Sequence, residues 1–312
     1  MFLVLIIMVG LCSNVFADNA IEHLQNTSVT IKSGNSEGSG NIIVREIIVN
    51  NGKKEKINFI LTAGHVVDDL RKVREIVDTD GTSKKIVEFN DASIIKEFRQ
   101  DGRRVGETKL DAKVLKFSDS NDGEDLALLI ILMHEFINEG IEFYLDDDIP
   151  SVGTEFFHCG SLLGQMGANS LTTGIMSQIG RVYKGNIYDQ TTVTAFPGSS
   201  GGGVFIKTND KAKYVGMIVR GSGETFNLMT PVRRIVKWTK NNNIEWVVNP
   251  KIPTPTLDQI LKMPIEAGYN HQKTSSKKTE KEEEEKLIFM DEEHKQEWKQ
   301  RLQTQLNQGE VK

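Results

Sequence analysis

Three short segments of the sequence carry residues suited to acyl-transfer chemistry, and the first contains a histidine. His65 follows the apolar run that ends in residues 61–64, so we expect it to project from the end of a strand after a glycine turn. A histidine titrates near neutral pH, which suits it to take a proton and return it. A histidine in this setting is more often structural than catalytic, so the interpretation depends on the other two segments.

The second segment begins with a carboxylate. Asp125 directly precedes the apolar residues 126–131, and no other charge follows for several positions. A buried carboxylate at the start of a strand needs a hydrogen-bond donor as partner. The alternative is a turn residue that only starts the strand. Asp122 and Glu124 are rival acids, but both lie farther out in the polar turn.

The third segment places two serines among glycines, in residues 196–205. Glycine permits backbone conformations and close approaches that other residues resist. The amides of Gly198 and Ser200 can then turn toward one point, which is the arrangement that holds a developing oxyanion. The alternative is a flexible Gly/Ser loop without chemistry.

In the order His65, Asp125, Ser200, the three segments resemble the trypsin-like (chymotrypsin-fold) serine proteases, because other triad families run in other chain orders. The resemblance implies that Ser200 is the nucleophile, that His65 is the general base and acid, and that Asp125 orients the imidazole. It also assigns the oxyanion hole to the amides of Gly198 and Ser200. The implied activity is that of a serine endopeptidase without a cofactor; the alternative is an inactive member that only binds peptides or acts in assembly.

Further blocks resemble the HtrA/Deg branch of this family. They lie at residues 160–164, 172–177, 195–198, 216–221 and 230–238. Residues 216–221 resemble the strand along which the family binds the substrate backbone, and residues 230–238 resemble its closing helix. The branch usually adds a PDZ module, which we do not expect here because residues 251–312 have the composition of a linker and a charged tail.

Two departures from the digestive members bear on activation and specificity. Ser199 stands where those enzymes carry an aspartate that pairs with a new N-terminus, so we do not expect activation by cleavage. The resemblance places Thr194 near the base of the substrate pocket and Val219, Gly221 and Asn227 on its walls. Because none of these is acidic, a small or apolar side chain is the expected fit. Arg220 either favours acidic substrate neighbours or points to solvent.

The elements that must position these residues read as strands. Apolar runs of strand length recur between Gly, Asn and Asp turns, for example at residues 41–44, 57–61, 127–130, 203–206 and 214–219. This spacing favours an all-β fold. Together with the resemblance it predicts two six-stranded antiparallel β-barrels with a cleft between them and a C-terminal helix, all within residues 18–248.

The two ends of the chain differ from this body. Residues 1–17 read as a signal peptide cleaved after Ala17, which predicts a secreted or periplasmic protein, although the usual basic residues before the apolar run are missing. An uncleaved anchor and a wrongly assigned start are the alternatives. Residues 249–270 are rich in proline and predict a linker. Residues 271–312 form a highly charged tail, helical or disordered, through which subunits can self-associate.

Composition excludes several classes of function. The 38 Lys and Arg residues against 43 Asp and Glu residues give a net charge of −5, which argues against a nucleic-acid binder. Cys12 lies in the predicted signal peptide, so Cys159 is left without a disulfide partner, and thiolate metal sites are not expected. His158 beside Cys159 raises the alternative of a metal site or a cysteine nucleophile, which would need further ligands or an activated thiolate. The expected partners are protein or peptide substrates, with no stable membrane insertion after signal cleavage.

Overall fold

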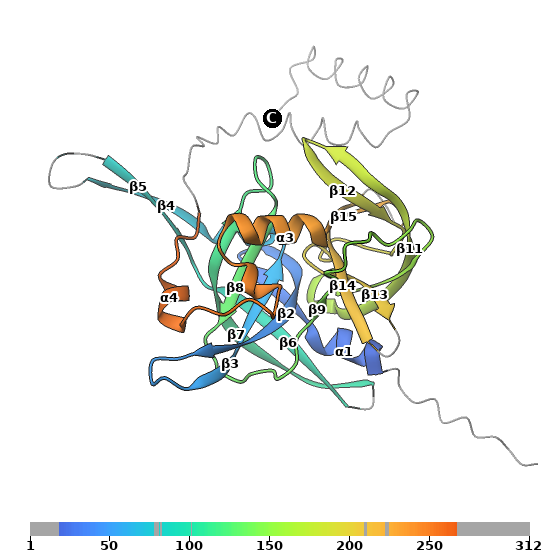
Figure 1. The fold of residues 1–312 in the computed structure, drawn as a ribbon, viewed down its shortest axis with the longest axis horizontal. Coiled ribbons are helices and arrows are strands. Elements are labelled where there is room, and N and C mark those ends of the chain that lie inside the picture. Colours follow the sequence, from blue (N-terminus) through green and yellow to red (C-terminus); the bar gives the residue numbers. More distant parts are fainter. Residues whose placement is uncertain are drawn as a thin grey trace, which may run out of the picture. The chain divides into compact units, whose positions relative to one another are not determined.

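The fold is mostly β, as the sequence predicts (Figure 1). A computed structural model of the 312-residue chain describes residues 19–266, apart from residues 78–80, 82, 101, 209–210 and 222–224. The predicted signal peptide, its cleavage site after Ala17 and the charged tail at residues 271–312 lie outside the described residues. No helix in the described part of the chain is long and apolar enough to cross a bilayer.

The first half of the body is a closed barrel of six antiparallel strands in the order β1-β2-β3-β8-β7-β6. The strands are β1 (Ser28–Ser33), β2 (Ser36–Ile48), β3 (Lys54–Thr62), β6 (Ala92–Gln100), β7 (Arg103–Ser118) and β8 (Leu126–Ile131). All six residues of β8 are buried, because this strand lies between β3 and β7 inside the closed sheet. Its continuous apolar sequence is typical of a strand covered on both faces.

The second half is a seven-stranded sheet in the order β13-β10-β11-β12-β15-β14-β9, and an additional pairing of β13 with β14 closes six of its strands into a ring. The strands are β9 (Glu142–Phe143), β10 (Glu155–Leu162), β11 (Gly167–Tyr183), β12 (Asn186–Thr191), β13 (Gly203–Thr208), β14 (Lys211–Gly221) and β15 (Asn227–Pro231). The prediction of two six-stranded antiparallel barrels is therefore confirmed in outline. The seventh strand, β9, pairs in parallel with β14 and was not predicted.

The second barrel has its own apolar core. Its buried side chains come from most of its strands and from the adjoining loops: Tyr144, Phe156, Met176, Val193, Val204, Val215, Ile218 and Met229. Burial of this kind contributes roughly 25 cal/mol per Å² of apolar surface removed from water. It holds the strands that flank the serine loop in fixed positions.

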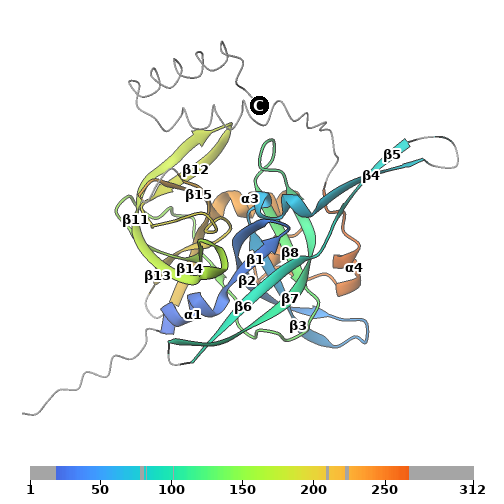
Figure 2. The same ribbon diagram turned by 180° about the vertical axis from the view of Figure 1, so that it is seen from behind.

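The remaining elements lie outside the two barrels. A hairpin of β4 (Arg71–Val77) and β5 (Ser83–Phe89) forms a separate two-stranded sheet that extends away from the body (Figure 2). The helices are α1 (Asn19–Thr27), α2 (Gly64–Val67), α3 (Val232–Asn241) and α4 (Leu257–Leu261), with 3₁₀ turns at Asp68–Leu70, Gly164–Met166 and Glu245–Val247. The α3 helix is the predicted C-terminal helix of the body.

The segment predicted as a linker packs along the first barrel. Within it, α4 begins with a capping box at Thr256, and Ile260 is buried. The amide of Phe117 donates to the Ile265 carbonyl at 3.1 Å, and Lys116 Nζ donates to the Pro264 carbonyl at 2.7 Å. Proline content favours an extended chain, but these contacts make residues up to 266 part of the compact body.

Candidate active site

His65 lies in a single helical turn that follows directly on β3. The strand ends at Thr62, and α2 begins two residues later at Gly64. This sharp change of direction turns the imidazole toward the loop between β7 and β8. The His65 side chain remains about a third exposed, so one edge of the ring is open to solvent.

Asp125 ends the loop between β7 and β8 and faces His65. Its backbone is left-handed, with φ of 56°, a conformation that costs a non-glycine residue free energy but is tolerated best by Asp and Asn. The carboxylate is 1% exposed, and His65 Nδ1 lies 3.0 Å from both of its oxygens. The His65 amide also donates to Oδ1 at 2.9 Å. Since an ionised carboxylate only accepts, Nδ1 carries the proton and Nε2 is left as an acceptor.

The two groups shift each other's titration. Burial lowers the pKa of His65, but the charge and hydrogen bond of Asp125 more than offset this effect, so the pKa lies above its usual value. Burial raises the pKa of Asp125, yet the His65 interactions and the charge of Arg220 outweigh it, so this pKa lies below its usual range. Asp125 is therefore anionic near neutral pH, and His65 holds its proton more tightly than a free imidazole does.

Ser200 lies on a tight loop between β12 and β13 that glycines make possible. Gly198 and Gly201 have φ values of +94° and +86°. A Cβ at Gly198 would lie 2.3 Å from the Ser161 carbonyl oxygen, and a Cβ at Gly201 would lie 2.1 Å from the Ser39 carbonyl oxygen. Both glycines are needed for the conformation and for the close packing, which is the reason for the glycines in this motif.

Ser39 holds this loop against the first barrel and was missed by the sequence analysis. Its amide donates to the Ser200 carbonyl at 2.7 Å, and its Oγ donates to the Gly198 carbonyl at 2.6 Å. The Ser161 amide donates to the same Oγ at 2.7 Å. Residues 38–40 read as an ordinary glycine-rich strand segment, so the only signal was a serine flanked by two glycines.

The loop lies beside the histidine turn, but the structure does not join all three predicted residues by hydrogen bonds. A Cβ added at Gly201 would lie 3.1 Å from the amide nitrogen of Ala63, two residues before His65. Within the part of the chain that the structure describes, no hydrogen bond links Ser200 Oγ to His65 Nε2. This contact often tightens only when substrate binds.

The predicted oxyanion donors have directions set by their peptide planes. The Pro197 carbonyl accepts from the Leu163 amide at 2.7 Å, and the Ser199 carbonyl accepts from the Gly202 amide at 2.9 Å. In a trans peptide the N–H points opposite to the C=O. The amides of Gly198 and Ser200 therefore point away from these partners, and neither donates to another group among the described residues.

Three of the four predicted pocket residues lie on the paired strands β14 and β15, and Thr194 lies in the loop after β12. Val219 is buried on β14, and Gly221 at the end of β14 pairs with Asn227 on β15. The Asn227 amide donates to the Val193 carbonyl at 2.8 Å, next to Thr194, whose own carbonyl accepts from Thr172 Oγ1. A Cβ at Gly221 would lie 2.0 Å from Asn227 Oδ1, so a larger residue there would have to displace the Asn227 side chain.

The rival residues do not occupy the position of Asp125. Arg234 of α3 holds the Glu124 carboxylate at 2.6 Å, and Asp122 is exposed in the polar turn. Cys159 is fully buried, and burial raises the pKa of its thiol to about 12, so it is neither reachable nor ionised. No cluster of three or more His, Cys, Asp or Glu side chains in the described ranges is placed to hold a metal ion.

His158 is buried as a neutral imidazole behind the serine loop. Its Nδ1 donates to the Gly203 carbonyl at 2.9 Å, and burial lowers its pKa to about 4, partly opposed by this hydrogen bond. The unfolded chain takes up a proton at this residue below about pH 6.5 while the folded chain does not, so stability is lost as pH falls from there toward 4.

We predict that His158→Gln removes this acid sensitivity. The unfolding free energy of the parent should fall by about 3 kcal/mol more than that of His158→Gln between pH 7 and pH 4.5, as an upper limit. Urea denaturation of both chains, each carrying Ser200→Ala to prevent self-cleavage, measures the difference. Equal losses of unfolding free energy in the two chains would contradict the conclusion that His158 is buried as a neutral imidazole.

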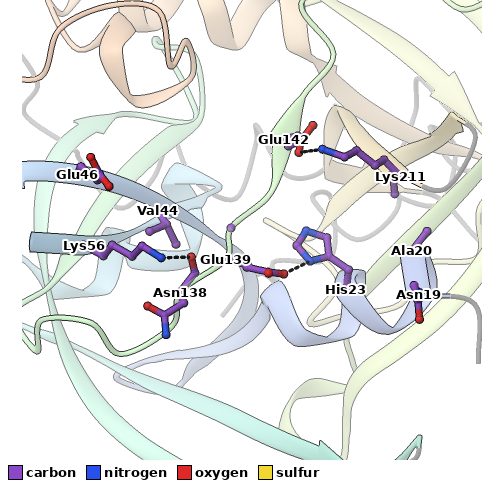
Figure 3. Close-up of a pocket in the computed structure, with 12 residues that line it drawn as sticks. Asn19, Ala20, His23, Val44, Glu46, Lys56, Asn138, Glu139, Glu142 and Lys211 are labelled. Carbon is purple, nitrogen blue, oxygen red and sulfur yellow. Dashed lines mark hydrogen bonds and ion pairs between the residues drawn. The ribbon is translucent and has the colours of Figure 1, made fainter.

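A cavity of about 550 Å³ lies elsewhere, beside α1 (Figure 3). Its charged lining consists largely of partnered side chains: Lys211 pairs with Glu142 at 2.6 Å, and His23 lies 3.7 Å from Glu139. The lining includes neither His65 nor Ser200. This cavity is therefore separate from the residues that carry the predicted chemistry.

Comparison with known proteins identifies the family to which the chain belongs. Residues 38–217, more than half of the chain, match the model of the trypsin-like peptidase domain. No curated protein matches the chain. The chain is similar to the crystal structure of the serine endoprotease from Yersinia pestis, with a TM-score of 0.49 and 18% sequence identity over 72% of this chain. The match spans 65% of the length of the Yersinia chain.

Proposed function

We propose that this chain, which belongs to the trypsin-like peptidase domain family, is a serine endopeptidase. The observation that carries the proposal is the pairing of His65 Nδ1 with both oxygens of the buried Asp125, beside a loop that presents Ser200. A buried carboxylate that fixes the imidazole tautomer is what a general base for a serine hydroxyl requires.

In the proposed mechanism, Ser200 Oγ attacks the carbonyl carbon of the scissile peptide bond as His65 Nε2 takes the hydroxyl proton. The resulting oxyanion is bound by the amides of Gly198 and Ser200. The C–N bond then breaks, and the leaving amine takes the proton from His65. Water, activated by the same nitrogen, hydrolyses the acyl-enzyme and restores Ser200.

The predicted substrate pocket, formed by residues of β14 and β15 with residues 193–194, is proposed to bind a small or apolar side chain. Its side chains are those of Val219, Asn227 and Thr194, none of which carries a charge, and the Asn227 amide is already bonded to the Val193 carbonyl. A Lys or Arg side chain would enter without a counter-charge and lose its hydration, which is unfavourable. We further propose export after cleavage of residues 1–17, and self-association through residues 271–312.

The test is cleavage of a diverse peptide library, with new termini identified by mass spectrometry. An endopeptidase produces internal cuts that disappear in Ser200→Ala, and we expect small or apolar residues before the cut. The alternative, a peptide-binding module without activity, predicts retention of peptides on the folded protein and no new termini. Cuts that persist in Ser200→Ala would assign the activity to another residue or to a contaminant.

The pH dependence of activity follows from the His65–Asp125 pair. His65 must be neutral to accept the serine proton. The charge and hydrogen bond of Asp125 hold the pKa of His65 above the ordinary histidine value of about 6.5. We therefore predict that kcat/KM falls as pH decreases, with a half-maximal point above about pH 6.5. Initial rates on one peptide across a pH series measure this point. A midpoint well below 6 would show that Asp125 does not raise the basicity of His65.

A further inference from the structure

Arg220 brings a positive charge from the second barrel to the loop that carries Asp125. It lies on β14, between Val219 and Gly221, and its side chain is 19% exposed. Its Nη2 donates to the Ser120 carbonyl at 3.2 Å and lies 4.0 Å from Asp125 Oδ2. The guanidinium also lies over the Tyr183 ring, 5.5 Å from its centre. These contacts direct the side chain toward Asp125 rather than out along the predicted substrate strand.

The Asp125 carboxylate needs such a neighbour. At 1% exposure it has lost most of its hydration, and among the described residues its hydrogen bonds come from the backbone and the imidazole of His65. Val219, on the same strand as Arg220, has an aliphatic side chain and offers no donor. A cation at 4.0 Å in a partly buried setting is a substantial favourable interaction with a carboxylate.

We propose that Arg220 is a positioning residue of the catalytic pair: its charge holds the Asp125 carboxylate in place from the second barrel and opposes the positive charge of a protonated His65. This inference rests on the proposed function. The contact joins the two barrels, because Arg220 lies on β14 of the second barrel and Asp125 in the loop before β8 of the first. The electrostatics of the active site therefore depend on how the two barrels pack against each other.

The other charged groups around the pair support this assignment. Asp119, at the start of the loop, lies 3.7 Å from Arg71, and Glu124 is bound by Arg234 at 2.6 Å. Asp68, beside α2, adds to the negative field at His65, whereas Arg220 opposes it. Removal of Arg220 should therefore leave the imidazolium less repelled and His65 more basic.

The test is NMR titration of His65, which does not depend on activity. The spectra are recorded on full chains that carry Ser200→Ala. The chain has six histidines, and the His65 signal is assigned as the one that disappears in His65→Gln. We expect Arg220→Gln to raise the pKa of His65 and Arg220→Lys to change it less. Arg103→Gln removes one exposed charge at the start of β7, at the opposite end of this strand from the loop that carries Asp125, and serves as the control without a shift. If Arg220→Gln fails to fold, Arg220→Met keeps the aliphatic packing on Tyr183.

The kinetic arm uses the same substitutions with Ser200 intact. We expect Arg220→Gln to lower kcat about tenfold at pH 7 with KM nearly unchanged, which corresponds to about 1.4 kcal/mol. An unchanged His65 pKa in folded Arg220→Gln would overturn the proposal, and a rise of KM confined to acidic peptides would assign Arg220 to substrate binding instead. A chain that shows the NMR shift but never cleaves peptides would refute the proposed function while leaving the electrostatic role of Arg220 in place.

Discussion

Ser200→Ala should lower kcat by about 10⁶-fold, because without the hydroxyl no acyl-enzyme can form and the remaining groups only bind substrate. Residual turnover should reflect the oxyanion donors and substrate binding alone. The measurement is single-turnover hydrolysis of a fluorogenic peptide that the wild-type chain cleaves, with far-UV circular dichroism to establish that the variant is folded.

Ser199→Ala is the matched control, because it removes the hydroxyl of the adjacent serine. Ser199 is buried, and its Oγ accepts from the Phe196 amide at 3.1 Å within the turn that precedes Ser200. Loss of one such hydrogen bond costs about 1 kcal/mol, so we expect at most a several-fold loss of activity. If Ser199→Ala were as inactive as Ser200→Ala, the assignment of the nucleophile within the serine pair would be wrong.

Asp125→Asn should lower kcat by about 10⁴-fold while the fold and KM stay close to wild type. The asparagine amide can donate to His65 Nδ1, which favours the tautomer with the proton on Nε2. That nitrogen then has no lone pair for the Ser200 proton. The present geometry, with Nδ1 3.0 Å from both carboxylate oxygens, depends on an acceptor at this position. Steady-state kinetics on the peptide used for Ser200→Ala measure the loss.

The control for this substitution is Asp122→Asn, which removes one carboxylate from the exposed part of the same loop. We expect its kcat to stay within about threefold of wild type, because a solvent-exposed charge is strongly screened. Equal losses in Asp122→Asn and Asp125→Asn would mean that the loop conformation, rather than the His65 pair, determines activity. Activity that survives in Asp125→Asn would remove the orienting role from Asp125.

The sequence was most informative where chemistry restricts the residue type. His65 follows one apolar strand and Asp125 precedes another 60 residues later, and each residue by itself is as well explained by a structural role. The order of the three segments and the family resemblance are what predict that the two meet. The glycines of the serine loop were predicted for conformational reasons, and the positive φ values of Gly198 and Gly201 agree with that reasoning. The position of Ser200 relative to this pair is likewise an inference from the family resemblance.

Contacts between distant segments leave no local signal in the sequence. Ser39 reaches the serine loop because β2, on which it lies, contacts that loop. A single serine between glycines gives no local sign of this role. The prolines of residues 249–270 predict a linker because proline disfavours helix and sheet, but Ile260 is buried and hydrogen bonds from Lys116 and Phe117 attach this segment to the first barrel. Such attachments depend on matching surfaces that periodicity does not encode.

Arg220 illustrates the same limit at the active site. From the sequence it was a residue of the substrate strand that pointed either to solvent or to acidic neighbours. The twist and register of β14 instead bring its guanidinium within 4.0 Å of Asp125, a residue of the other barrel. Side-chain direction of this kind is set by how the two barrels pack, which no local pattern records.

The central claim is that Ser200 is activated as a nucleophile, and covalent labelling with a fluorophosphonate probe tests it most directly. We expect the folded wild-type chain to gain one phosphonyl group, located by peptide mass spectrometry on Ser200. Ser200→Ala and heat-unfolded wild type should gain none. A folded wild-type chain that stays unlabelled, or that carries the label on another residue, would contradict the claim.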